Sequence, residues 1–386
     1  MSAPALITSG PGGRPALLVL EDGTTFHGTS FGADGETFGE MVFNTGMTGY
    51  QETLTDPSYA RQIVAMTAPH IGNTGVNDTD AESRQIWVSG YVVREPARLA
   101  SSWRAQRSLQ AELTAQGVTG IAMAGTRALT RHLRDAGAMR AGISADTTDA
   151  EALLARVLAS PQMIGADLAR EVSTPESYVV SPPAGTPVRY RVAAVDLGIK
   201  AATPRSMAAL GCEVHVLPAT SSADEIAAVN PDGVFFSNGP GGPAAISYAV
   251  EAMRGTLSGG LPVFGICLGS QVLGRALGLD TYKLRFGHRG VNQPVQDVRT
   301  GRVQITSHHH GFAVALPEGT APGVTFSTGF GPAEITHVNL NDGVVEGLRL
   351  LDAPAFSVQY HPEAAPGPHD ASGLFGEFCE LMAGCR

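Results

Sequence analysis

The sequence predicts a two-domain α/β protein, with a mixed β/α domain followed by a domain built on a parallel sheet flanked by helices. Strand-like runs separated by glycine turns fill the first half. The stretch from Ser173 to Pro187 is rich in proline, which neither a helix interior nor a central strand accepts. After it, strands and helices alternate as in βαβ units. We therefore place the first domain at residues 16–172, the linker at 173–187 and the second domain at 188–386.

Composition narrows the class of protein. The chain has 386 residues, a formal charge of −10 and a pI of about 5.5, which argues against a nucleic-acid partner. Its cysteines form no CxxC pair, and it has neither a secretory signal nor an apolar run of membrane length. We expect a soluble cytoplasmic protein with reduced thiols. Residues 1–15, rich in Gly, Pro and Ser, are expected to form a disordered tail.

In the first half, Asp-Gly pairs and single glycines divide apolar, β-branched runs, and helical periodicity appears only later. The predicted strands are 16–23, 24–28, 40–46, 62–67 and 85–93, and the predicted helices are 109–116, 127–135 and 150–159.

In the second half, short buried runs alternate with amphipathic segments that end at glycine. The predicted strands are 190–195, 213–217, 233–237 and 262–266, and the predicted helices are 203–210, 223–229, 244–257 and 268–277. Beyond Tyr282 we expect shorter, hairpin-like strands that form an antiparallel extension.

Cys267 stands where the strand PVFGI turns directly into the helix LGSQVLG. A sharp strand-to-helix turn exposes the residue at its apex, and Gly265 and Gly269 remove side chains that would clash there. The helix N-terminus carries a partial positive charge, which favours a thiolate. A buried core cysteine is the alternative, but the three features together favour a nucleophile.

Two further loops follow predicted strands, at the edge where ligands of parallel sheets bind. Residues 237–243, SNGPGGP, form a loop with bare N–H groups that either stabilises an oxyanion or is an ordinary turn. His361 and Glu363 in YHPE point to the same side if the backbone is extended. Glu363 would then orient the imidazole, and His361 would serve Cys267 as a base.

The motifs SNGPG, GICLGxQ and HPE together resemble the class I, triad-type glutamine amidotransferases. In the first half, FNTGMTGYQETLTDPSYARQIV and APHIGNTGVNDTDAES resemble the small-subunit family of carbamoyl-phosphate synthase, as do VDLGIK, FGHRGVNQPV and HHGFAV in the second. The similarity extends over nearly the whole chain from Ala16. It implies a C-terminal amidotransferase domain with a flavodoxin-like parallel sheet, preceded by the mixed β/α domain.

The resemblance also implies an activity and a partner. Such a chain hydrolyses glutamine through a thioester and passes ammonia to a large subunit, which makes carbamoyl phosphate from bicarbonate and ATP for arginine and pyrimidine synthesis. No cofactor is expected in this chain, because ATP and Mg²⁺ belong to the partner. The expected assembly is a heterodimer that associates into higher oligomers.

By the same resemblance, Cys267 attacks the amide, His361 moves protons and Glu363 orients His361. The backbone N–H groups of Leu268 and Gly241 would form the oxyanion hole. The implied glutamine contacts are Ser58, Gly239, Gly241, Leu268, Gln271, His309, Gly311 and Phe312.

The sequence departs from the family pattern at Ser270, where His is common, at Gly242, where Asp is common, and at His309, where Asn is usual. His308 and His310 would share one face of a strand, with His309 opposite. Because no acidic or thiol ligand is identifiable near them, we predict no metal site. Two alternatives remain open: an amidotransferase-like paralogue with an altered or regulatory role in a specialised pathway, and an independent cysteine hydrolase such as a peptidase.

Overall fold

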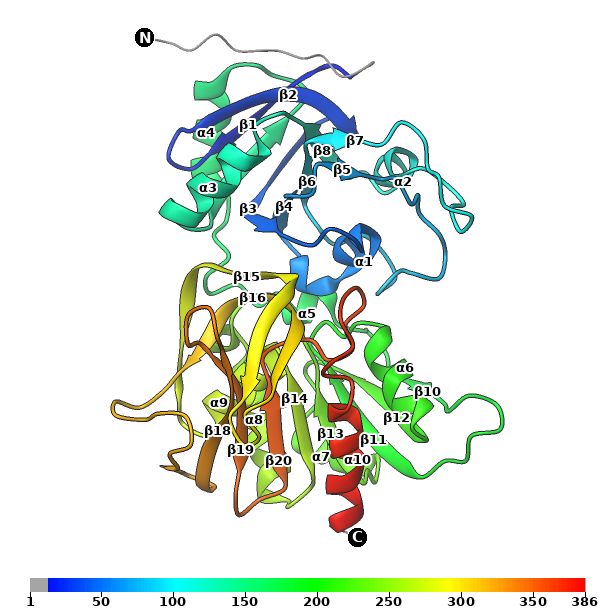
Figure 1. Ribbon diagram of the computed structural model, residues 1–386, viewed down its shortest axis with the longest axis vertical. Coiled ribbons are helices and arrows are strands. Elements are labelled where there is room, and N and C mark those ends of the chain that lie inside the picture. Colours follow the sequence, from blue (N-terminus) through cyan, green and yellow to red (C-terminus); the bar gives the residue numbers. More distant parts are fainter. Residues whose placement is uncertain (1–12, 386) are drawn as a thin grey trace. The chain divides into compact units, whose positions relative to one another are not determined.

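The computed structural model describes residues 13–385, which divide into two compact units between Met163 and Ile164 (Figure 1). Residues 1–12 of the predicted tail lie outside the described residues, and strand β1 already begins at Pro15. The predicted linker, 173–187, falls within the second unit, because it contains strand β10 (Tyr178–Val180), which pairs with a strand of the main sheet.

In the first unit, seven strands close into a barrel in the order β1–β2–β8–β6–β4–β3–β9. The strands are β1 (Pro15–Leu20), β2 (Thr25–Gly32), β3 (Glu36–Asn44), β4 (Gln62–Met66), β6 (Gly90–Val93), β8 (Thr119–Ala122) and β9 (Met139–Ser144). Leu18, Ile63, Val92, Ile121 and Ile143, each from a different strand, belong to one buried cluster. Closure removes the exposed edges that a short open sheet would leave.

Helices and short strands surround this barrel. They are α1 (Tyr50–Thr55), α2 (Leu109–Ala115), α3 (Thr126–Ala136), α4 (Ala150–Ala159), a 3-10 turn (Pro57–Tyr59) and the paired β5 (His70–Ile71) and β7 (Glu95–Pro96). Helix α4 buries Leu153 against Leu17 and Val19 of β1. The predicted strand 85–93 is shorter than expected, since only its end forms β6.

The second unit contains one mixed sheet in the order β10–β12–β11–β13–β14–β20–β19–β18–β15–β16, with β17 paired to β18. Its parallel part comprises β12 (Cys212–Pro218), β11 (Tyr190–Asp196), β13 (Gly233–Phe236), β14 (Val263–Ile266) and β20 (Ala355–Val358). Side chains on the two faces of these strands belong to two different buried clusters. Val234 and Phe236 belong to one cluster, whereas Phe235 and Phe264 belong to the other. Both faces of the parallel sheet are therefore covered, as predicted.

Helices cover the two faces. The helices are α5 (Ala169–Val172), α6 (Ala202–Ala209), α7 (Ala223–Ala228), α8 (Ser247–Ser258), α9 (Leu268–Ala276) and α10 (Leu374–Gly384). Helices α7, α8 and α9 contribute Ile226, Met253 and Val272 to one cluster, whereas α6 and α10 contribute Met207 and Phe378 to the other. No helix between residues 13 and 385 is both long and apolar enough to cross a membrane.

The remaining strands form the predicted antiparallel extension. They are β15 (Asp280–Asp297), β16 (Val303–Ala315), β17 (Phe326–Thr328), β18 (Gly331–Asn339) and β19 (Val345–Leu350). The expectation of shorter strands beyond Tyr282 is wrong for β15 and β16, which have 18 and 13 residues. Register shifts after Lys283 and Gly290 let this long ribbon bend while it stays paired, and a sequence pattern of period two does not show such bulges.

Candidate active site

Three adjacent parallel strands bring the predicted site residues to one edge of the sheet. Strands β13, β14 and β20 lie side by side in the same direction. The loop 237–243 follows β13, Cys267 follows β14, and His361 comes shortly after β20. Since all three follow carboxyl ends, they meet at the edge where open α/β sheets bind ligands.

Cys267 occupies a strained turn between β14 and α9. Its φ and ψ are 55° and −104°, a conformation that non-glycine residues rarely adopt. The flanking glycines are required by close packing: a Cβ on Gly265 would lie 2.7 Å from the carbonyl oxygen of Gly269, and one on Gly269 would lie 2.1 Å from that of Phe236. The glycines that the sequence analysis singled out therefore permit this turn, and such strain is typical of functional positions.

His361 and Glu363 form a buried pair. Nδ1 of His361 lies 2.7 Å from Oε1 of Glu363, so the expected hydrogen bond is present. Burial alone would lower the pKa of His361, but the charge of Glu363 and the nearby sulfur of Cys267 outweigh it and raise the pKa to about 10. The ring therefore holds a proton at neutral pH.

Lys200 is a further member of this group that the sequence analysis did not identify. Its Nζ lies 3.1 Å from Oε1 of Glu363, and both side chains are buried. Burial would raise the pKa of Glu363, but the charge of Lys200, and then that of His361, lowers it to about 2. A signal existed in the sequence: Lys200 follows the carboxyl end of β11, and the chain has only one other lysine, Lys283.

The thiol of Cys267 is buried in the candidate active site. The expectation of an exposed apex is wrong, because Cys267 and His361 are each only 2 % exposed. Sγ of Cys267 donates a hydrogen bond to the carbonyl oxygen of His309 at 3.5 Å. Nε2 of His361 has no well-aligned hydrogen-bond partner among residues 13–385, so its contact with Cys267 is loose. Hydrogen bonds between a nucleophile and its base are often long without substrate. Such burial keeps bulk water away from the thiol.

Several predicted glutamine contacts lie next to one another. Nε2 of Gln271 donates to the carbonyl oxygen of Phe312 at 2.9 Å. A Cβ on Gly242 would lie 3.1 Å from the Phe312 ring, and one on Gly239 would lie 3.0 Å from Leu268. The departure at Gly242 thus removes a side chain where loop 237–243 approaches Phe312.

The other predicted glutamine contacts lie on a strand, in a loop and in a short turn. His309 and Gly311 are on β16, and Gly241 adopts a left-handed φ of 81°. Ser58 is in the first unit, within the turn Pro57–Tyr59, where its N–H donates to Asp56. Its contact with glutamine stays a prediction.

At the departure Ser270, Oγ lies 2.9 Å from Oγ of Ser357 on β20, within hydrogen-bonding distance. This contact gives the buried hydroxyl group of Ser270 a hydrogen-bond partner and links α9 to the sheet.

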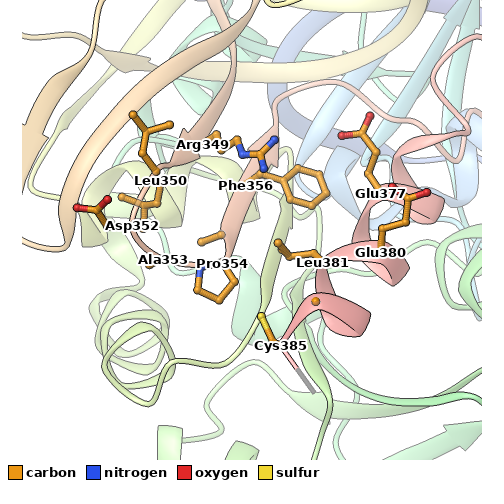
Figure 2. Close-up of a pocket in the computed structure, with 13 residues that line it drawn as sticks. Arg349, Leu350, Asp352, Ala353, Pro354, Phe356, Glu377, Glu380, Leu381 and Cys385 are labelled. Atoms are coloured by element: carbon orange, nitrogen blue, oxygen red, sulfur yellow. The ribbon is translucent and has the colours of Figure 1, made fainter.

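A pocket of about 480 Å³ lies between α10 and the connection from β19 to β20. Figure 2 shows the residues that line it. Its charged lining includes Arg349 and Glu377. This pocket lies where β20 begins at Ala355, whereas Cys267 and His361 follow carboxyl ends of strands. It is therefore separate from the candidate active site.

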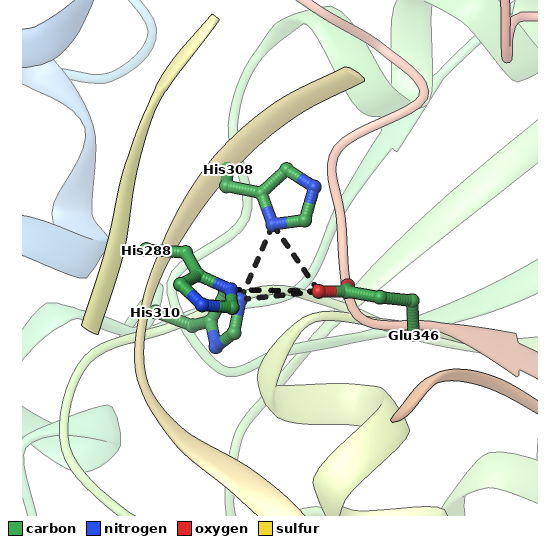
Figure 3. Close-up of side chains that lie close together, drawn as sticks. All are labelled: His288, His308, His310 and Glu346. Carbon is green, nitrogen blue, oxygen red and sulfur yellow. Dashed lines mark hydrogen bonds and ion pairs between the residues drawn. The ribbon is translucent and has the colours of Figure 1, made fainter. Parts of the chain in front are cut away.

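One group of side chains among residues 13–385 has the spacing of metal ligands: His288, His308, His310 and Glu346 (Figure 3). His308 and His310 share a face of β16, as predicted. The carboxylate that the sequence analysis did not identify is Glu346, which β19 brings to the histidines from a distant part of the chain.

Comparisons with known proteins identify the family to which each half of the chain is similar. The family model of class-I glutamine amidotransferases matches residues 193–381, which include Cys267, His361 and Glu363. The second unit is therefore a class I glutamine amidotransferase domain on an α/β fold, as predicted. The model of the carbamoyl-phosphate synthase small chain, CPSase domain, matches residues 18–143 of the first half.

Curated relatives match over nearly the full length. The carbamoyl phosphate synthase small chain of Streptomyces coelicolor is 62 % identical over 381 residues, which cover 98 % of this chain and 99 % of that protein. The small chain of Mycobacterium tuberculosis is 58 % identical over 96 % of this chain and 98 % of its own length. The small chain of Bifidobacterium longum is 57 % identical over 95 % of this chain and 94 % of its own length. The chain belongs to the carbamoyl-phosphate synthase small-chain family and is an enzyme subunit of that class.

Proposed function

We propose that this chain hydrolyses glutamine through a covalent thioester on Cys267. The sulfur attacks the side-chain amide carbon, and the imidazolium of His361 gives its proton to the leaving nitrogen, which departs as ammonia. Water then attacks the thioester, His361 accepts a proton from it, and glutamate leaves as the thiolate re-forms. The raised pKa of His361 supports this proposal, because the ring carries the proton that the first step needs.

The negative charge that develops on the amide oxygen requires donors that are already in position. We assign this role to the N–H groups of Leu268 and Gly241. Leu268 is the first residue of α9, where a helix leaves N–H groups without intrahelical partners. Oε1 of Gln271 is buried and has no hydrogen-bond partner among residues 13–385, so it is suited to accept from the substrate's ammonium group.

The proposed partner is the large subunit of carbamoyl-phosphate synthase. Ammonia released at Cys267 would pass to that subunit through a closed path, because protonation in water would destroy its nucleophilicity. The partner would hold ATP and Mg²⁺ and make carbamoyl phosphate from bicarbonate in the cytoplasm, for arginine and pyrimidine synthesis. The small-chain names of the relatives support this pairing.

The observation that carries the proposal is the strained position of Cys267 beside the His361–Glu363 pair. Cys267→Ser should abolish glutamine hydrolysis while circular dichroism stays unchanged, because a hydroxyl is a far weaker nucleophile than a thiolate. Cys385→Ser, at an exposed cysteine, is the control and should keep full activity. Full activity in Cys267→Ser would refute the assignment.

A second candidate is a paralogue with weakened glutamine use, which the departures at Ser270, Gly242 and His309 favour. The large subunit, supplied with either glutamine or ammonia, distinguishes the two. Equal rates of carbamoyl phosphate formation from both donors support the main proposal. A normal rate with ammonia and none with glutamine supports the second.

A further inference from the structure

We propose that His288, His308, His310 and Glu346 bind one divalent transition-metal ion, with Zn²⁺ as the best fit. We call these four residues the histidine cluster (Figure 3). They come from three strands of one sheet: β15 carries the first, β16 the next two and β19 the last. Ligands on paired strands are held rigidly, as a metal site requires.

The distances within the histidine cluster fit one central ion. Nδ1 of His308 lies 3.3 Å from Nε2 of His310. Oε1 of Glu346 lies 3.6 Å and 3.9 Å from these two nitrogens, and 3.5 Å from Nδ1 of His288. Four ligands at about 2.0–2.1 Å from a tetrahedral Zn²⁺ are roughly 3.3 Å apart. All four ligand atoms lie within 4.8 Å of one another, so the cluster has to contract to reach this spacing around an ion.

Hydrogen bonds fix which nitrogen of each β16 ring faces the cluster. Nδ1 of His310 lies 2.9 Å from the carbonyl oxygen of Phe312, which only accepts, so Nδ1 carries the hydrogen and Nε2 keeps its lone pair. Nε2 of His308 lies 2.8 Å from Oγ1 of Thr306, whose own hydrogen goes to the carbonyl oxygen of Gln293 at 2.9 Å. Nδ1 of His308 therefore presents its lone pair to the cluster.

The other two members are oriented in the same way. Nε2 of His288 lies 2.8 Å from a carboxylate oxygen of Asp342, which leaves Nδ1 toward Glu346. Asn339 donates to Oε1 of Glu346 at 3.2 Å. A ring nitrogen tied to a carbonyl, hydroxyl or carboxylate acceptor is the usual outer support of a histidine that binds metal.

This arrangement places lone pairs against lone pairs. The 3.3 Å contact between His308 and His310 joins two nitrogens that both lack a hydrogen, and Glu346 adds an oxygen to the same point. The side chain of Glu346 is fully buried, and its Oε2 has no hydrogen-bond partner among residues 13–385. One proton satisfies only one such pair, whereas one cation accepts electron density from all four ligands.

The ligand set selects the kind of ion. Imidazole with one carboxylate suits Zn²⁺ and similar first-row ions, whereas Mg²⁺ and Ca²⁺ take mostly oxygen and Cu⁺ prefers sulfur. Four protein ligands leave no open position, which indicates a structural ion. It would stabilise the part of β16 around His309, whose carbonyl oxygen accepts from Cys267.

The experiment uses the full chain without a polyhistidine tag, freed of metal by a chelator and titrated with Co²⁺. We expect one equivalent to bind with the intense visible bands of four-coordinate Co²⁺, which Zn²⁺ then removes. His308→Gln and the isosteric Glu346→Gln should each lower the affinity by at least about 100-fold. His337→Gln should change nothing, because His337 is an equally buried histidine on β18 outside the cluster.

Thermal unfolding gives a second readout that does not depend on activity. Zn²⁺ at about 100 times its Kd should raise the Tm of the wild-type chain by roughly 5 °C and leave that of His308→Gln unchanged. The proposal is overturned if the wild-type chain binds neither ion, or if His308→Gln binds as tightly as wild type. It is also overturned if NMR shows an imidazolium at His288 that persists in excess Zn²⁺.

Discussion

The second unit contains two buried groups of histidine and glutamate, and they behave in opposite ways. At the active site, the pKa of His361 is raised to about 10, with Glu363 beside it. In the histidine cluster, burial and neighbouring rings lower the pKa of His308 and His310 well below the usual value. One group holds a proton on His361, whereas in the other His308 and His310 present neutral nitrogens. Within that second group, Glu346 and Asp342 outweigh burial and raise the pKa of His288.

The difference lies in what stabilises each carboxylate. Burial would raise the pKa of both, but Lys200 lies 3.1 Å from Glu363 and keeps it ionised. Burial prevails at Glu346, whose pKa is raised although His288 and Asn339 oppose the shift. A bound cation would stabilise the ionised form of Glu346, as Lys200 stabilises the ionised form of Glu363. The same two residue types therefore give the proposed proton shuttle where a lysine is present and the proposed ligand set where it is not.

Matched amide substitutions at the two carboxylates should give the largest effect and separate the groups. Glu363→Gln keeps the size of the side chain but leaves the ring of His361 without its anion, so kcat for glutamine hydrolysis should fall by about 10⁴-fold. Co²⁺ binding should stay as in wild type, because Glu363 is not a member of the histidine cluster. Steady-state rates and visible spectra of each variant provide the two measurements.

Glu346→Gln is the reciprocal control. It should lose Co²⁺ binding and leave the proposed nucleophile, base and orienting carboxylate intact, so the chemical step should persist. If both substitutions reduced activity and metal binding to the same extent, the two groups would act as one site and the comparison would fail.

The sequence was sufficient to predict the strands and helices in the parallel half of the second unit. From β11 to α9 the predicted bounds lie within three residues of the observed ones, because each strand and helix ends at a local signal such as Gly211. The turn at Cys267 and the contact between His361 and Glu363 were also predictable, since both depend on residues close together in the chain.

What the sequence did not reveal depends on pairing between distant segments. Closure of the barrel requires β1 to pair with β9, and no local pattern encodes that contact. Lys200 and Glu346 are each a single residue in an ordinary loop or strand, and only the sheet brings them to Glu363 and the histidine cluster. Ion pairs and ligand sets of this kind become visible only when the strand order is known.

Removal of Lys200 tests why the two carboxylates differ. Lys200→Met leaves Glu363 buried with one partner fewer, so the free energy of unfolding should fall by about 3–5 kcal/mol and glutamine hydrolysis should weaken. Urea unfolding followed by circular dichroism measures the stability. Lys283→Met, at the only other lysine, is the control and should shift stability by less than about 1 kcal/mol. Equal losses in both variants would contradict the proposed role of Lys200.

The outer hydrogen bonds of the histidine cluster should have a smaller, separable effect. Thr306→Val removes the oxygen that accepts from Nε2 of His308, so Zn²⁺ affinity should fall about 10–100-fold while glutamine hydrolysis continues. Thr336→Val removes a similar contact, from the buried His337, and should leave Zn²⁺ affinity unchanged. Competition with a coloured chelator measures both, and identical affinities in the two variants would argue against a fixed ring orientation at His308.

The last comparison concerns the dependence of stability on pH at the active site. The folded-state pKa of His361, about 10, exceeds the unfolded value of about 6.5. Its contribution to stability is therefore complete below pH 6.5 and is lost as the pH rises toward 10, by at most about 1.4 kcal/mol per pH unit. Glu363, Lys200, Cys267 and His308 are the charged or titratable groups that act with it. Urea unfolding between pH 7 and 9 should show this slope in the wild-type chain and a flatter one in His361→Gln. Equal slopes would mean that His361 does not hold its proton when folded, and the contrast with His308 and His310 would disappear.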